Sequence, residues 1–168
     1  MFESEIIEFN ILKSIFGKNK KFELIFRASR DGRSAQAFHL ECDGKSRTLS
    51  LFQISNGDII GAYTEAVWDS LGRYKSDKNA FIFYYDKERN KTSISKVIKP
   101  DYAIYGVSSY GPTFGDRHDL YSTDLTNLQY NLGSSFSRIE LKNSSSGYNL
   151  NYYQINFIIK EFEVFQVE

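Results

Sequence analysis

Residues 48–64 read TLSLFQISNGDIIGAYT and carry the strongest fold signal in this chain. Two apolar runs, 48–54 and 58–64, flank the dipeptide Asn56-Gly57. This dipeptide is typical of type I′ turns, whose backbone twist matches that of two paired strands. The stretch therefore predicts a β-hairpin, and the rest of the fold can be built outward from it.

Several other segments have the apolar or alternating composition and the flanking turn residues of strands. Gly61, inside the returning strand of the hairpin, indicates a bulge or a close approach to its backbone. A Ser/Asn/Gly-rich stretch at 143–149 is expected to be a loop. The further strand candidates are residues 22–27, 81–85, 94–98, 103–107, 120–122, 135–139 and 157–167.

Two helices are expected. Residues 4–16 place most of their apolar side chains on one helical face, and Gly17 follows as a natural end. After a turn at residues 29–32, Ser34 can cap a short helix over 35–41. The first helix is expected to dock on the body of the domain.

These elements predict a mainly β fold with short helices (α+β), in which two antiparallel sheets pack as a sandwich. The aromatic content of 16% favours the half-buried surfaces of strands. With 168 residues, the chain is long enough for one domain with a real core. Residues 1–21 are expected to form the N-terminal amphipathic helix and a connection, and residues 22–168 the main body of a single globular unit.

Charge and cysteine content restrict the class of protein. Basic and acidic residues number 21 each, so the formal net charge is zero, which disfavours nucleic-acid binding. A single cysteine cannot form an internal disulfide, which fits a reducing compartment. The first residues lack the pattern of a signal peptide, and no apolar run is long enough to span a bilayer. The chain is therefore expected to be cytoplasmic and not inserted in a membrane.

The residues with reactive side chains do not form a recognisable catalytic motif. His39 and Cys42 lie about one helical turn apart, and His118-Asp119 could approach them from elsewhere in the fold. Such a group would permit a Cys–His nucleophile pair or a zinc site, but no signature accompanies it. We therefore favour a buried thiol and a hydrogen-bonded histidine. Redox sensing at Cys42 would require partial exposure.

The glycines and the charged turns do not indicate a specific binding or catalytic site either. Gly106, Gly111 and Gly115 do not form a phosphate loop, since no GxGxxG pattern or following Lys-Ser/Thr is present. The polar stretch 115–119 (GDRHD) could line a pocket, although a turn entering a strand is the simpler interpretation. The sequence therefore predicts no catalytic residue, no cofactor and no metal site.

Four longer stretches resemble the TLDc domain family, in order and at the family's spacing across residues 22–167. They are FRASRDGRSAQAFHLECDGKSRTLSLFQISNGDIIGAYT (26–64), WDSLGRYKSDKNAFIF (68–83), YAIYGVSSYGPTFGDRHDLYSTD (102–124) and IIKEFEVFQV (158–167). The resemblance implies a two-sheet sandwich with a few short helices and a role in resistance to oxidative stress. It also implies action by protein contact, because several family members bind and regulate the V-type proton ATPase.

The leading hypothesis is thus a non-enzymatic interaction domain without a cofactor, with V-type ATPase subunits as partner. One alternative is a redox- or peroxide-active enzyme that uses Cys42, His39 and His118. A second is a nucleic-acid-binding regulator, which the balanced charge disfavours. Arg27, Arg30 and Asp31 are expected to stabilise a turn or to contact a partner, as are His118 and Asp119.

Overall fold

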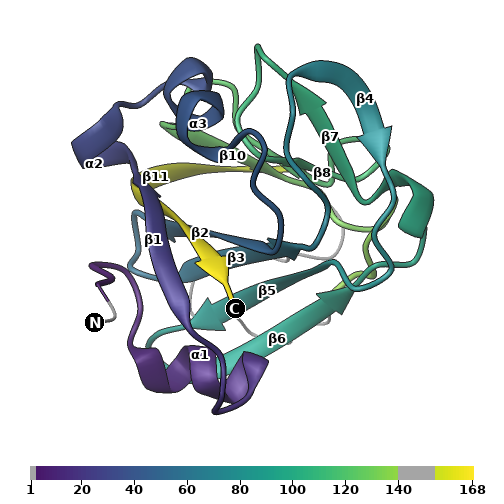
Figure 1. The fold of residues 1–168 in the computed structure, drawn as a ribbon. Helices are drawn as coiled ribbons and strands as arrows, with labels where there is room; N and C mark the ends of the chain where they lie inside the picture. Colours follow the sequence, from purple (N-terminus) through teal and green to yellow (C-terminus); the bar gives the residue numbers. More distant parts are fainter. Residues whose placement is uncertain (1–2, 140–153) are drawn as a thin grey trace.

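The structure is a computed structural model that describes residues 3–139 and 154–168. Its antiparallel strands pair into two groups that share the last strand, β11 (Ile155–Val167) (Figure 1). The first sheet has the order β6-β5-β3-β2-β11-β1, and the second has the order β4-β7-β8-β9-β10-β11. The mainly β prediction with short helices is confirmed.

The strand bounds show which segments build each sheet. The first sheet contains β1 (Phe22–Arg27), β2 (Thr48–Ile54), β3 (Ile59–Thr64), β5 (Phe81–Asp86) and β6 (Lys91–Lys96). The second contains β4 (Leu71–Lys75), β7 (Ile104–Val107), β8 (Thr113–Phe114), β9 (Leu120–Tyr121) and β10 (Asn127–Tyr130). The helical segments are α1 (Phe9–Phe16), α2 (Ala28–Asp31), α3 (Ala35–Cys42) and the 3-10 turn η1 (Pro100–Tyr102).

Strand β11 joins the two sheets. Its first residues, from Ile155 to Ile158, pair with β10, and its later residues pair with β2 and β1. The pairing with β2 is irregular between Ile159 and Glu161, next to the point where β11 leaves the second sheet. A strand that passes from one sheet to another at such an irregularity is a common way to build a sandwich corner.

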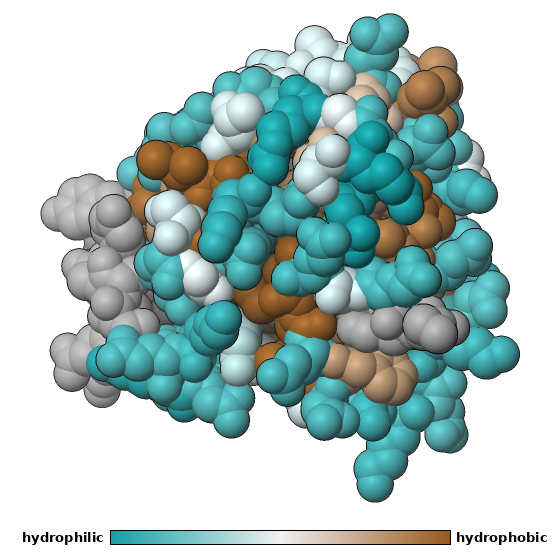
Figure 2. All heavy atoms as spheres, turned by 90° about the vertical axis from the view of Figure 1, so that its left-hand side faces the viewer, coloured by the Kyte–Doolittle hydropathy of each residue, from teal (hydrophilic) through white to brown (hydrophobic). Residues whose placement is uncertain are grey.

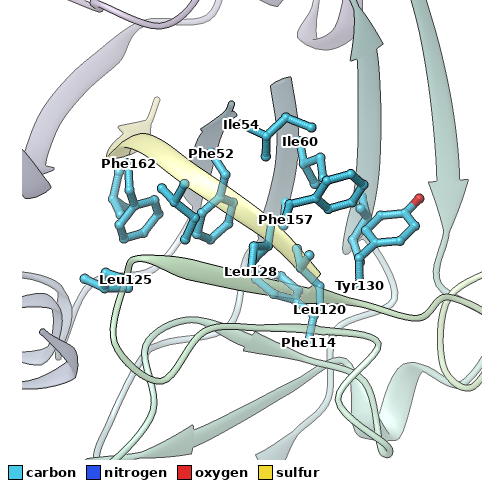
Figure 3. Close-up of a cluster of buried hydrophobic side chains, with 14 of the residues drawn as sticks. Phe52, Ile54, Ile60, Phe114, Leu120, Leu125, Leu128, Tyr130, Phe157 and Phe162 are labelled. Carbon is cyan, nitrogen blue, oxygen red and sulfur yellow. The ribbon is translucent and has the colours of Figure 1, made fainter. Parts of the chain in front are cut away.

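The main core fills the space between the two sheets. Phe52 of β2 and Phe162 of β11 stack there with ring centroids 4.4 Å apart (Figure 3). Leu120, Leu128 and Phe157 come from the second sheet and its junction with β11, and they point into the same cluster. Burial of these side chains from both sheets supplies most of the hydrophobic stabilisation.

A second apolar cluster covers the other face of the first sheet. Helix α1 packs there, and the Phe16 ring lies 5.4 Å from Phe22, 5.1 Å from Tyr63 and 5.3 Å from Phe81 between centroids. The first sheet is therefore buried on both faces, which explains why β2, β3 and β5 read as nearly continuous apolar runs. The expected docking of the N-terminal helix is confirmed.

Helix α1 is shorter than the prediction of residues 4–16, because it begins at Phe9. The Ser4 hydroxyl accepts hydrogen bonds from the backbone N–H groups of Ile6 and Ile7, so these residues form a local turn. Ile6 and Ile7 are buried all the same, which is why they extend the apolar pattern beyond the helix. The predicted end is confirmed, since Gly17 has φ of +91° and donates to the Lys13 carbonyl.

The predicted hairpin over residues 48–64 is confirmed, but its turn is not type I′. Type I′ needs positive φ at both central residues, whereas in this turn only Gly57 has it. Gly57 donates to the Ile54 carbonyl and Ile54 donates to Asp58, so three residues connect the strands, with glycine in the left-handed position. At Gly61 the pairing has no bulge. Instead, an added Cβ would lie 2.1 Å from Cε1 of Phe83.

Strand β6 of the first sheet spans Lys91–Lys96 and not the predicted 94–98, and other differences come from the second sheet. Strands β4, β8 and β10 lie outside the predicted segments, because they are short or largely exposed. The strand predicted at 135–139 is wrong: only Phe136 forms an isolated bridge, with Val97. The successive N–H groups of Ser134, Ser135 and Phe136 donate to the carboxylate of Asp119 instead of to a strand. The predicted loop at 143–149 lies outside the described residues.

Candidate functional site

Helix α3 and the two turns before it form a surface that contains several of the predicted site residues. Ser34 caps α3 by accepting a hydrogen bond at its Oγ from Ala37 N, as predicted. Phe38 and Cys42 face the core and are completely buried. At the far end, Gly44 N donates to the Trp68 carbonyl and Trp68 N donates to Lys45 O. The helix is thus fixed at both ends and along its inner face.

A hollow of about 550 Å³ runs along the outer side of α3. Four neutral hydrogen-bonding side chains line part of it, together with Asp31, His39 and Asp43. Leu40 also lines the hollow and is 81% exposed, so an apolar side chain stands at the rim of a polar groove. The neutral polar residues are Ser34, Gln36, Ser70 and Ser108.

The His39 side chain links helix α3 to the segment that contains Tyr110. Its Nδ1 lies 2.7 Å from Asp43 Oδ1, and its Nε2 lies 2.8 Å from the carbonyl oxygen of Tyr110. The Ser70 hydroxyl donates to the other oxygen of Asp43 over 2.7 Å. Because both ring nitrogens already face oxygen acceptors within the protein, neither is available as a base toward a molecule in the groove. The prediction of a hydrogen-bonded histidine is confirmed.

Cys42 points from the same helix into the core and has no exposed surface. Burial, with smaller contributions from Asp43 and Glu41, raises the pKa of its thiol. A raised thiol pKa disfavours the reactive thiolate. The partial exposure that redox sensing requires is therefore not met, and the favoured interpretation as a buried thiol is confirmed.

The turn at α2 has the local pairing expected for it. Arg30 donates from Nε and a terminal nitrogen to the two oxygens of Asp31, over 2.7 and 2.8 Å. Asp31 also accepts a hydrogen bond from the backbone N–H of Arg27 at 2.8 Å. The hydrogen bond from Arg30 holds the pKa of the Asp31 carboxyl below its usual value. The face that carries α2 and β1 is largely hydrophilic, with apolar side chains visible in patches between the polar ones (Figure 2).

His118 and Asp119 lie in a different part of the chain, the turn before β9. The His118 ring contacts those of Tyr105, Tyr110 and Tyr121 at 5.3–5.7 Å, and burial lowers its pKa. Asp119 is buried; burial raises its pKa even though three backbone N–H groups donate to its carboxylate.

No contact brings Cys42 together with His39 and His118. In residues 3–139 and 154–168, no group of three or more His, Cys, Asp or Glu side chains is placed to hold a metal ion.

Comparison with known families shows to which family the chain belongs. A family model described as the TLDc domain matches residues 4–168. The chain belongs to the TLDc family. A search of curated proteins finds no match. Within the described residues of this TLDc chain, no helix is long and apolar enough to cross a membrane.

The closing TLDc strand contains two acidic residues whose contacts the sequence did not reveal. Glu161 accepts hydrogen bonds from the backbone of Ser29 and Phe162, at 3.2 and 2.9 Å. Glu163 is completely buried and pairs with Arg27, whose terminal nitrogen lies 2.9 Å away. The sequence carried one signal for these contacts: two carboxylates stand in a mainly apolar strand, and a buried charge requires a partner.

Glu163 also fastens the N-terminal segment of this TLDc chain. The Ser4 hydroxyl donates to one carboxylate oxygen over 2.6 Å, and the Glu5 backbone N–H donates to the other over 3.0 Å. Arg27 reaches the same segment, since it donates to the Glu3 carbonyl and lies 3.3 Å from the Glu5 carboxylate. Segments from both ends of the chain therefore meet beside α2.

Proposed function

We propose that this TLDc chain is a non-enzymatic protein-interaction domain that supports resistance to oxidative stress. In this proposal it acts in the cytoplasm by binding and regulating the V-type proton ATPase. The TLDc match over residues 4–168 carries the proposal, since TLDc proteins are associated with oxidation resistance. The geometry of α3 suggests where the contact is made.

The α3 groove has the composition of a protein-binding surface. Leu40 provides an apolar side chain that a partner can cover, and serine and glutamine side chains around it can form hydrogen bonds at the rim. The helix that presents Leu40 is held by the Ser34 cap and the His39 contacts. A surface that is already ordered loses little conformational entropy on binding.

The same geometry supports contact over thiol chemistry. A peroxide-active enzyme would need Cys42 to be reached by its substrate, and this side chain has no exposed surface. A general base near it would need a free ring nitrogen, but both nitrogens of His39 face acceptors. The observations therefore favour the outer side of α3 as the surface that contacts a partner.

Affinity purification of the tagged chain from its own cells, followed by mass spectrometry, tests the proposal. We expect subunits of the V-type ATPase among the recovered proteins and a reduced recovery with Leu40→Asp. Burying a leucine side chain contributes about 1.5–3 kcal/mol, so its loss weakens binding roughly 10- to 100-fold. The matched control is Ile158→Asp, because Ile158 is 63% exposed but lies on β11.

Two results together would overturn the proposal. The first is that pump subunits are never recovered, even after cross-linking. The second is that acidification of vesicles is unchanged when the chain is deleted from the cell. Equal recovery with Leu40→Asp and the wild type would retain the pump as partner but would move the contact away from α3.

A further inference from the structure

A hollow of about 320 Å³ lies where α1 meets β5 and β6, at one edge of the first sheet (Figure 1). Most of its lining is apolar, with Ile15 from α1, Phe81 from β5 and Ile94 from β6. Two lysines, Lys78 and Lys96, also line it, and none of the lining residues is acidic. The hollow thus combines an apolar wall with cationic groups, unlike the α3 groove.

The apolar wall continues the second apolar cluster of the protein. Ile15 and Phe81 both pack against that cluster, and the Phe81 ring lies 5.3 Å from that of Phe16 between centroids. Ile94 also lines the hollow and is 48% exposed. The wall is therefore ordered by the core behind it, and a ligand that covers its outer surface removes apolar area from water.

The two lysines extend from fixed positions in the backbone. Lys78 lies in a turn that is closed by the buried Asp77, whose carboxylate accepts a hydrogen bond from Asn79 N over 2.8 Å. Lys96 N donates to Ser137 Oγ over 3.0 Å, and Ser137 N donates to the Lys96 carbonyl over 2.8 Å. The places from which both cations reach the hollow are therefore set before any ligand arrives.

The charges that face this hollow are of one sign. Within residues 3–139 and 154–168, neither Lys78 nor Lys96 forms an ion pair with a carboxylate. Two carboxylates lie behind the wall without lining it, and both bind Asn79: Asp77 accepts from its backbone N–H, and Glu65 accepts from its Nδ2 over 2.8 Å. A molecule in the hollow therefore meets two cations and no anion.

We propose that this hollow binds a fatty acid, an unbranched aliphatic chain that ends in a single carboxylate. The aliphatic chain covers Phe81 and Ile94, and the carboxylate accepts hydrogen bonds from the ammonium groups of Lys78 and Lys96. A volume of about 320 Å³ is at the lower end of the range of about 300–1,000 Å³ usual for small-molecule sites, which are mostly apolar with a few polar groups. Lysine suits this site, because its apolar stem packs on the aliphatic chain while its ammonium group stays in water beside the carboxylate.

An NMR titration of the purified chain with octanoate tests this assignment, with 1-octanol as the uncharged control ligand of equal length. We expect saturable shifts of the amide signals of Phe81 and Ile94, and binding that tightens roughly fourfold for each methylene added from octanoate to decanoate. Octanol should bind more weakly than octanoate.

Replacement of the two cations tests the recognition of the carboxylate. The double variant Lys78→Gln/Lys96→Gln should bind octanoate roughly three- to tenfold more weakly and octanol unchanged, because exposed ion pairs contribute little each. The matched control is Lys87→Gln/Lys91→Gln, which removes two exposed lysines from the β5–β6 hairpin that do not line the hollow. Both variants replace exposed side chains, so their thermal unfolding midpoints should equal that of the wild type.

Three results would overturn the proposal. They are the absence of saturable octanoate binding, equal binding of octanol and octanoate, and equal weakening in the double variant and its control. A short peptide of alternating glutamate and leucine is titrated in parallel, and its binding in place of octanoate would assign the hollow to a protein segment instead of a fatty acid. Leu40→Asp should leave octanoate binding unchanged, because Leu40 lines the separate α3 groove, so failure of either proposal leaves the other standing.

Discussion

Replacement of Glu163 by alanine is the sharpest test of how the fold is closed. This carboxylate has no exposed surface and accepts hydrogen bonds from Ser4 Oγ, Glu5 N and Arg27 Nε at 2.6–3.0 Å. The Arg27 side chain, only 15% exposed, would lose its buried partner and keep the Glu3 carbonyl and the Glu5 carboxylate, whose side chain is 64% exposed. The variant therefore leaves a largely buried guanidinium without adequate compensation.

The expected cost follows from that burial. Removal of one partner of a buried ion pair typically costs about 3–5 kcal/mol. Glu5 recovers part of this for Arg27, so we expect the free energy of unfolding to fall by about 3 kcal/mol. For a domain of this size, such a loss lowers the thermal midpoint by roughly 6–12 °C. With a total stability of about 5–15 kcal/mol, most of the variant protein should remain folded.

Urea denaturation followed by fluorescence of the single Trp68 measures this change directly. The matched control is Glu23→Ala, because Glu23 lies on the neighbouring strand β1 with an exposed side chain. That substitution should change the free energy of unfolding by less than about 0.5 kcal/mol. A loss below about 1 kcal/mol for Glu163→Ala, or equal losses for both variants, would contradict the role of Glu163 as the buried partner of Arg27 and the N-terminal segment.

Three further outcomes are expected. The thiol of Cys42 should resist iodoacetamide in the native protein and react only in denaturant, because it is buried with a raised pKa; mass spectrometry detects rapid native labelling if this is wrong. Gly61→Ala should lower the free energy of unfolding by about 1–3 kcal/mol in urea titrations, since its Cβ would overlap the buried Phe83 ring, and an unchanged midpoint would contradict that packing. Burial opposes ionisation of Asp124, but backbone hydrogen bonds from Thr126 and Asn127 outweigh it and lower its pKa to about 2. The folded-state pKa is thus below the unfolded one, so Asp124 stabilises the fold above about pH 4 and this contribution is lost toward pH 2. Stability measured across that range should fall less steeply in Asp124→Asn.

The local sequence correctly predicted those elements for which residue preferences and tertiary packing favour the same structure. The 48–64 hairpin combines turn residues with strands that are buried on both faces, and Ser34 caps α3 through its own side chain. Only the type of the turn differs from the prediction. The connection has three residues instead of two, and of these only Gly57 has a positive φ. These features depend on contacts within a few residues of each other.

The parts that could not be predicted depend on distant partners. Residues 4–8 continue the apolar pattern of α1, but the bond from Ser4 to Glu163, 159 positions away, holds them in a turn. Residues 135–139 read as a strand, yet the N–H groups of Ser135 and Phe136 donate to Asp119. Neither carboxylate can be assigned this role without knowledge of which segments become neighbours.

The candidate site shows the same division. The sequence predicted α3 from its Ser34 cap, and the absence of a catalytic or zinc signature favoured a hydrogen-bonded His39 and a buried Cys42. It did not identify Leu40 as the exposed apolar residue, because that depends on which face of α3 the core covers. The Tyr110 carbonyl that holds His39 comes from 71 residues further along the chain.

In the proposed function, this TLDc chain protects against oxidants by contact and not by thiol chemistry. The most direct measurement is survival under peroxide of cells that lack the chain and carry Leu40→Asp or Cys42→Ala at equal protein abundance. We predict that Cys42→Ala restores survival to the wild-type level and that Leu40→Asp does not. Loss of protection with Cys42→Ala and full protection with Leu40→Asp would contradict the claim.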